Sequence, residues 1–106
     1  MVRQIATLEE FNTLVSEGKV VMIDFTATWC GPCKMISPEF ERLSGEYTDI
    51  TFVKVDVDAN SDAAAKCEIS AMPTFQVWKD GAKKAELVGA SPEKLKALCE
   101  QAKGML

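Results

Sequence analysis

Histidine is absent from this sequence of 106 residues, and cysteine, proline and aromatic residues are sparse. Without histidine the chain cannot form a Ser-His-Asp or Cys-His catalytic centre, or a zinc site with an imidazole ligand. A c-type haem is excluded as well, because Lys34 stands where the CxxCH attachment motif needs its histidine. Thiol and carboxyl groups are therefore the main candidates for chemistry.

A long hydrophobic run is also missing, since no stretch of about 18 apolar residues is present to span a bilayer. The opening MVRQIATLEEF has one basic residue but no apolar core of the length that a secretory signal needs. The twelve basic residues are scattered in a chain of net charge -4, which does not suit a phosphate backbone or an anionic membrane. We expect a cytoplasmic protein with no membrane or nucleic-acid partner, although a removed organellar transit peptide would leave no trace.

The four cysteines are too few for a small secreted scaffold that is held together by disulfides. With 47% hydrophobic residues and no linker, residues 1–106 are expected to form a single domain with a sizeable core. In a reducing compartment, the cysteines that such a protein keeps are more often catalytic, redox-active or metal-binding than structural.

Apolar periodicity predicts strands that alternate with helices. Strands are predicted at 2–5, 19–27, 50–57, 74–79 and 83–88, and helices after Thr7, from the cysteine pair to Tyr47, near 62–67 and after Ser91. Thr7 and Glu10 form a capping box, Gly18 suits a left-handed helix cap, and Asp80-Gly81 suits a tight hairpin. The fold class is α/β, a mixed five-stranded central sheet flanked by four helices on its two faces.

The stretch TWCGPCK at 28–34 places two cysteines at the start of the second helix, directly after a buried strand. There Cys30 would meet unpaired backbone amides and the positive end of the helix dipole, which favour the thiolate, so Cys30 is predicted to be the nucleophile at an exposed position. Cys33 lies one turn deeper, and positions i and i+3 of a helix are roughly 5 to 6 Å apart, within the reach of a disulfide. A reversible bridge is expected.

Residues around the pair fit the same interpretation. Pro32 suits the first helical turn, and Gly31 leaves the flank of Cys30 open to a disulfide of another protein. Trp29 offers an apolar surface beside the sulfur, or else is an ordinary core aromatic.

Zinc is the main alternative for the cysteines. An all-cysteine zinc site normally uses two close pairs, whereas Cys67 and Cys99 are isolated and fall on apolar helical positions. These two cysteines are expected to pack in the core, with regulatory oxidation as the other interpretation.

Asp24 is an ionisable residue inside an apolar strand. On an edge strand it would be exposed. If both faces of the strand are covered, burial should raise its pKa, so that it could act as a general acid or base near neutral pH. Lys54 on the next strand is a possible partner that would moderate this effect.

Five segments make the chain resemble the thioredoxin family over nearly its whole length, and MVRQI at 1–5 with ATWCGPCKMI at 27–36 makes it most similar to the cytosolic thioredoxins of eukaryotes. These segments are WCGPCK at 29–34, DFTATWC at 24–30, VDVD at 55–58, the triplet Met72-Pro73-Thr74, and Gly89-Ala90. CxxC within a βαβ pattern is typical of that fold.

The resemblance implies a thioredoxin fold and a role for each site residue. Cys30 would attack a substrate disulfide, Cys33 would resolve the mixed disulfide, and Asp24 would assist Cys33 through water, with Lys54 near it. Pro73 would be a cis-proline that lets the backbone at Met72 pair with an extended substrate segment. The docking rim would consist of Trp29, Gly31, Pro32, Met72, Pro73, Gly89 and Ala90.

We therefore predict a protein-disulfide reductase that acts on disulfide-containing target proteins and is recycled by a thioredoxin reductase. No cofactor or metal is predicted, because the chain has no phosphate-binding glycine loop. A monomer is expected, since Ala71 occupies a position where some animal thioredoxins carry a cysteine. The alternatives are a zinc-binding module and a non-catalytic protein-binding module of the same fold.

Overall fold

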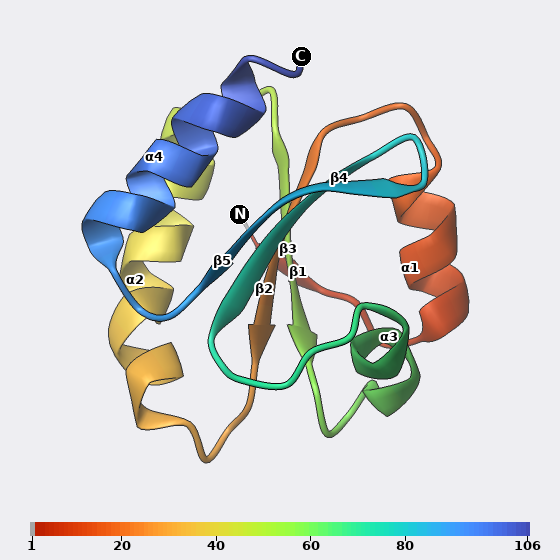
Figure 1. Cartoon of the computed structure of the whole chain (residues 1–106), viewed down its shortest axis with the longest axis vertical. Coiled ribbons are helices and arrows are strands. Elements are labelled where there is room, and N and C mark those ends of the chain that lie inside the picture. Colours follow the sequence, from red (N-terminus) through yellow and green to blue (C-terminus); the bar gives the residue numbers. More distant parts are fainter. Residues whose placement is uncertain (1) are drawn as a thin grey trace.

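The computed structural model describes residues 2–106, which form a mixed sheet with helices on both faces (Figure 1). In chain order the elements are β1 (Arg3–Gln4), α1 (Leu8–Val15), β2 (Val21–Thr26), α2 (Gly31–Glu46), β3 (Thr51–Asp56), α3 (Ser61–Lys66), β4 (Thr74–Lys79), β5 (Ala82–Val88) and α4 (Pro92–Lys103). The predicted order of five strands and four helices is confirmed.

The strands lie in the order β1-β3-β2-β4-β5. Strands β1, β3 and β2 run parallel, β4 is antiparallel to β2, and β5 is antiparallel to β4. The carboxyl ends of β2, β3 and β5 therefore meet the amino end of β4 at one edge of the sheet. A functional site of an open α/β sheet is expected at these strand ends, which are called the sheet edge below.

Two apolar clusters fill the space between the sheet and its helices. The first contains Phe40 and Leu43 from α2 and Leu95 and Leu98 from α4, and the second contains Phe11 from α1 and Ala63 from α3. Figure 1 shows α2 and α4 on one side of the sheet and α1 and α3 on the other. Because β2 lies between the two layers, its residues 21–25 are all buried.

Side-chain caps set where the helices begin. The hydroxyl of Thr7 accepts from the amide of Glu10, and that of Ser91 accepts from the amide of Lys94. The carboxylate of Glu10 in turn accepts from the amide of Ala6, one residue before the predicted partner. The predicted capping box is therefore present with a small change of partner.

The end of the first helix differs from the prediction. Gly18 is left-handed with a φ of 81°, but α1 ends at Val15 and Ser16 is its cap. The hydroxyl of Ser16 donates to the carbonyl of Asn12 at 2.8 Å, a local bond that competes with further helical turns. Gly18 instead belongs to the turn that leads into β2.

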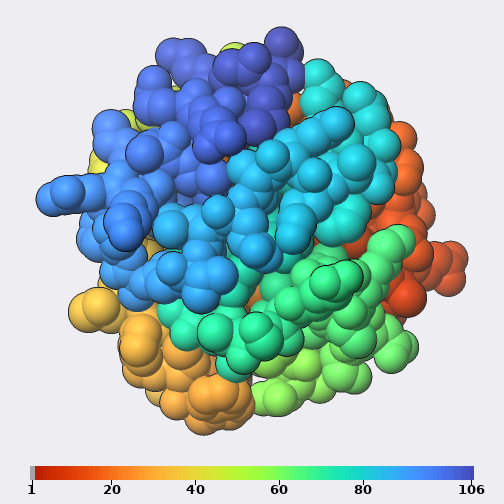
Figure 2. Space-filling model, viewed as in Figure 1, coloured from red at the N-terminus to blue at the C-terminus, as the bar shows by residue number. Residues whose placement is uncertain are grey.

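Figure 2 shows that the segment around the start of α2 (orange) and the segment before β4 (teal) lie next to each other at one end of the molecule. Within residues 2–106, no helix has both the length and the apolar character needed to cross a bilayer.

Candidate active site

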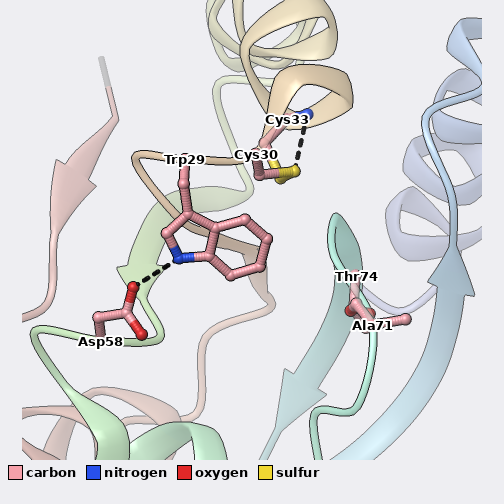
Figure 3. Close-up of a disulfide and its surroundings, with 6 residues drawn as sticks. All are labelled: Trp29, Cys30, Cys33, Asp58, Ala71 and Thr74. Carbon is pink, nitrogen blue, oxygen red and sulfur yellow. Dashed lines mark hydrogen bonds between the residues drawn. A yellow bond between two sulfur atoms is a disulfide. The ribbon is translucent and has the colours of Figure 1, made fainter.

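The two cysteines are joined in a disulfide where β2 gives way to α2. Cys30 is the N-cap of α2 with an extended backbone, and Cys33 is in the first turn of the helix. Their Cα atoms are 5.3 Å apart, as the helical spacing predicts. The amide of Cys33 donates to the sulfur of Cys30 at 3.2 Å, so a free backbone donor of the helix start does point at this sulfur (Figure 3).

The expected exposure of Cys30 is not found in the disulfide form. Cys30 is 5% exposed and Cys33 is 1% exposed, so both are buried, with Cys30 the less covered of the two. They form a small apolar cluster with Ala27, against which Val57 and Met72 pack. Met72 comes from the segment before β4, and the sequence alone could not show that it packs against the cluster of the two cysteines.

Trp29 lies on the surface rather than in the core, with 66% of its area exposed. Its indole N–H donates to the carboxylate of Asp58 at 2.8 Å, which holds the ring beside the disulfide (Figure 3). The interpretation of Trp29 as a core aromatic is therefore wrong. Asp58 was missing from the predicted site, although its place after β3 puts it at the same sheet edge as the end of β2.

Asp24 is buried in β2 and lies opposite Lys54 of β3 in the parallel register. Only 3% of its surface is exposed, and its Oδ1 has no hydrogen-bond partner within residues 2–106. Burial raises the pKa of Asp24 from 3.8 to about 7, and the charge of Lys54 opposes this increase. The expectation of an exposed edge position is therefore wrong, and the buried alternative is confirmed.

A pocket of about 200 Å³ brings Asp24 and Lys54 together with Cys33 of the disulfide. Asp24, Cys33, Lys54 and Asp56 all line it. A polar pocket of this size can hold water, because the carboxyl groups of Asp24 and Asp56 and the ammonium group of Lys54 provide several hydrogen-bond partners. The buried acid and Cys33 therefore line one space of a size that admits water.

The predicted rim residues come from three segments at the same sheet edge. The bond between Met72 and Pro73 is cis, and the amide of Gly89 donates to the carbonyl of Pro73 at 2.9 Å. The hydroxyl of Thr74 donates to the carbonyl of Ala71 at 2.6 Å and closes the turn in front of β4. Figure 3 shows Ala71 and Thr74 on the chain that faces the cysteine pair.

Two other rim positions leave room for a partner. A Cβ at Gly31 would meet nothing within 4 Å, and the same holds at Gly89, whose φ is 113°. The flank of Cys30 at Gly31 is therefore open, as predicted. Ala90 packs against the core cluster of α2 and α4, so it joins the rim to the body of the protein.

The remaining cysteines lie away from this site. Cys67 and Cys99 are both free and buried, the first in the cluster of α1 and α3 and the second in that of α2 and α4. Burial raises the pKa of each thiol to about 11. Because the sheet separates them, they cannot join Cys30 and Cys33 around one zinc ion, and residues 2–106 hold no group of three potential ligands.

Two cysteines that can form a disulfide lie at the start of a helix, on a mixed sheet of this topology. This combination defines a thiol–disulfide oxidoreductase. The sequence model of the family described as Thioredoxin matches residues 2–101, and the chain belongs to that family. The chain is 54% identical to the thioredoxin of Coprinus comatus over 103 residues, which is 95% of this chain and 97% of the relative. Curated relatives of this kind support a protein-disulfide oxidoreductase role, and the chemistry of the site agrees.

Solved structures agree with the family assignment. The thioredoxin of Plasmodium falciparum superposes with a TM-score of 0.92 at 43% identity, over 94% of this chain and 98% of that one. A second neighbour comes from a study of thiol resolution in yeast mitochondrial 1-Cys peroxiredoxin via glutathione/thioredoxin systems. It has a TM-score of 0.90 at 41% identity and covers 94% of each chain.

Proposed function

We propose that this thioredoxin-family chain reduces disulfides of target proteins with Cys30 as the nucleophile and Cys33 as the resolving thiol. The observation that carries the assignment is the amide of Cys33, which donates to the sulfur of Cys30 at the helix start. The same donor and the helix dipole would stabilise a Cys30 thiolate in the reduced protein. Cys33 lies deeper in the protein and is less exposed to solvent than Cys30.

The proposed reaction has two exchange steps. The Cys30 thiolate attacks one sulfur of the target disulfide, which breaks that bond and releases the other target sulfur as a thiolate that takes up a proton. Cys33 then loses its proton and attacks the Cys30 sulfur of the mixed disulfide. The Cys30–Cys33 disulfide forms, the bond from Cys30 to the target breaks, and the second target sulfur leaves as a thiolate that takes up a proton. Two electrons have then passed from the dithiol to the target.

Asp24 is proposed to receive the proton of Cys33 in the second step. Both residues line the same pocket, and a pKa near 7 lets the carboxyl both accept and release a proton at neutral pH. Lys54 is proposed to keep this pKa from rising further, since its positive charge favours the ionised carboxylate.

Substrate docking is proposed at the rim of Trp29, Gly31, Pro32, Met72, Pro73, Gly89 and Ala90. The open flanks of Gly31 and Gly89 and the exposed ring of Trp29 support this assignment. Met72 packs against the cluster that contains both cysteines, so a segment that pairs with the backbone at Met72 would lie close to the disulfide.

The partners are proposed to be disulfide-containing proteins, with peroxiredoxins among them, and a thioredoxin reductase that restores the dithiol. We further propose that the chain works as a cytosolic monomer of one domain. The free thiols of Cys67 and Cys99 are in keeping with a reducing compartment, and Ala71 leaves no thiol for an intermolecular disulfide at that rim position.

Insulin reduction by dithiothreitol tests the reductase assignment. The chain should accelerate the turbidity that follows insulin reduction, and the Cys30→Ser/Cys33→Ser double variant should show only the rate of dithiothreitol alone. A non-catalytic binding module would leave both rates at that background value.

A further inference from the structure

Gln76 is a fully buried polar side chain that the proposed reaction does not use. It lies in β4, where its solvent exposure is 0%, and its neighbours in the strand are apolar. A buried amide costs free energy unless its hydrogen bonds are made, so its partners matter. Within residues 2–106, its hydrogen-bond partners lie in the sheet or at the end of α3.

Three hydrogen bonds fix the orientation of this amide. Its Nε2 donates to the carbonyl of Cys67 at 3.1 Å and to the carboxylate of Glu86 at 2.7 Å. Its Oε1 accepts from the indole N–H of Trp78 at 2.8 Å. Because an indole can only donate and the other two partners can only accept, no other orientation of the amide satisfies all three.

Two of these hydrogen bonds are made to residues from which the chain continues into the proposed rim. Cys67 caps α3, and the chain from there to Thr74 carries Met72 and Pro73. Glu86 lies opposite Gln76 on β5, which leads directly to Gly89. At the rim itself, the amide of Gly89 donates to the carbonyl of Pro73, so the two segments are joined both there and at Gln76.

We propose that Gln76 is a positioning residue for substrate docking, because its amide holds the 68–73 segment and the end of β5 in one fixed arrangement. The inference rests on the docking rim proposed above. Gln76 lies three residues after Pro73, roughly 10 Å along an extended chain, and its hydrogen bonds are to Cys67, Glu86 and Trp78 and not to the cysteines of the disulfide. Its effect should appear in the recognition of an extended protein segment and not in sulfur chemistry.

The test compares a protein disulfide with a small one. Gln76→Met keeps the length of the side chain but removes all three hydrogen bonds. Initial rates against insulin concentration should show KM raised about three- to tenfold with kcat little changed, as expected for loss of one or two docking hydrogen bonds. Reduction of 5,5′-dithiobis(2-nitrobenzoic acid), which has no extended segment to dock, should keep the wild-type rate.

Trp78→Phe is the matched control. It removes the third hydrogen bond of the same buried amide but leaves the bonds to Cys67 and Glu86, so it should lower stability without raising KM for insulin. Urea unfolding should show that both variants are folded. If Trp78→Phe raises KM as much as Gln76→Met does, the effect is general loosening of the core and the inference is overturned.

Trp29→Ala shows whether a negative result contradicts the role of Gln76 or the proposed docking rim itself. If Trp29→Ala raises KM for insulin and Gln76→Met does not, the rim stands and the role of Gln76 is wrong. If neither variant changes KM, the proposed rim is wrong and the inference fails with it.

Discussion

The ionised carboxylate of Asp24 is expected to lower the stability of the fold, while the proposed mechanism needs this carboxylate for activity. Its carboxyl is buried between the two helical layers, and its Oδ1 lacks a hydrogen-bond partner within residues 2–106. A group of this kind weakens the fold when it is ionised, because the charge has been removed from water. Asp24 and Cys33 line the same polar pocket, where the proposed mechanism uses the buried acid as a proton acceptor.

Asp24→Asn should raise stability more at pH 8 than at pH 4. The folded-state pKa of about 7 lies above the unfolded value of 3.8, so between these pH values the native state holds the proton that the unfolded state has lost. The wild type therefore loses stability as pH rises through this window, by up to about 4 kcal/mol at roughly 1.4 kcal/mol per pH unit. Urea unfolding of both proteins across pH 4–8 measures the difference, and a constant difference would contradict the burial argument.

The same variant should slow reduction of insulin although it is more stable. An amide of nearly the same shape cannot accept the proton of Cys33, so the resolving step should lose its base. Turnover of wild type and variant should be compared across roughly pH 6–9, a range that contains the pKa of Asp24 and approaches that of a thiol. Equal rates throughout would remove Asp24 from the proposed mechanism.

For single residues, the sequence predicted those features that depend on the spacing of two residues or on the neighbouring residues in the chain. The distance between Cys30 and Cys33 follows from helical geometry, and the burial of Asp24 follows from the apolar strand around it. The packing of Met72 against the cysteine cluster, the bond from Trp29 to Asp58 and the network of Gln76 depend on segments far apart in the chain. Local patterns carry no information about such contacts.

At the scale of elements, the hairpin between β4 and β5 depends on two left-handed residues. Asp80 has a φ of 54° and Gly81 a φ of 75°, as a tight two-residue turn requires. The amide of Gly81 also donates to the carbonyl of Val15 at 2.8 Å, which ties the turn to the end of α1. The turn was predictable because Asp-Gly is a strong local signal, whereas its bond to α1 was not.

Gly81→Ala should lower the free energy of unfolding by about 1–2 kcal/mol, the usual cost of a left-handed conformation for a residue with a Cβ. Its Cβ would lie 3.7 Å from the hydroxyl of Ser16, so the cost comes from the backbone and not from a clash. Gly45→Ala is the control, because Gly45 lies in α2 with nothing within 4 Å of its Cβ position. This change should stabilise by up to about 1 kcal/mol, and urea unfolding that showed the same sign for both would contradict the argument.

At the scale of the whole molecule, the two core clusters share one sheet. Phe40 packs on Phe52 on the side of α2 and α4, and Phe11 packs on Trp78 on the side of α1 and α3, each with ring centroids 5.2 Å apart. The layered fold followed from the sequence because each helix has one apolar stripe and each long connection favours parallel pairing. The proposal of a single domain follows from the same arrangement.

Phe11→Leu and Phe40→Leu should each lower the stability of the entire chain. Both rings are fully or almost fully buried, and their truncation should cost on the order of 1–2 kcal/mol by loss of packing. Urea unfolding of each oxidised variant, followed by tryptophan fluorescence and far-UV circular dichroism, should give one transition with coincident midpoints. Two separate transitions would show that the two faces of the sheet unfold independently.

The assignment of different roles to Cys30 and Cys33 is the central claim, and trapping of the mixed disulfide tests it most directly. Each reduced single variant, Cys30→Ser and Cys33→Ser, is incubated with insulin and analysed by intact mass without reductant. Cys33→Ser should accumulate a covalent insulin adduct at Cys30 that dithiothreitol releases, because attack proceeds and resolution does not. An adduct on Cys30→Ser and none on Cys33→Ser would show that Cys33 is the nucleophile.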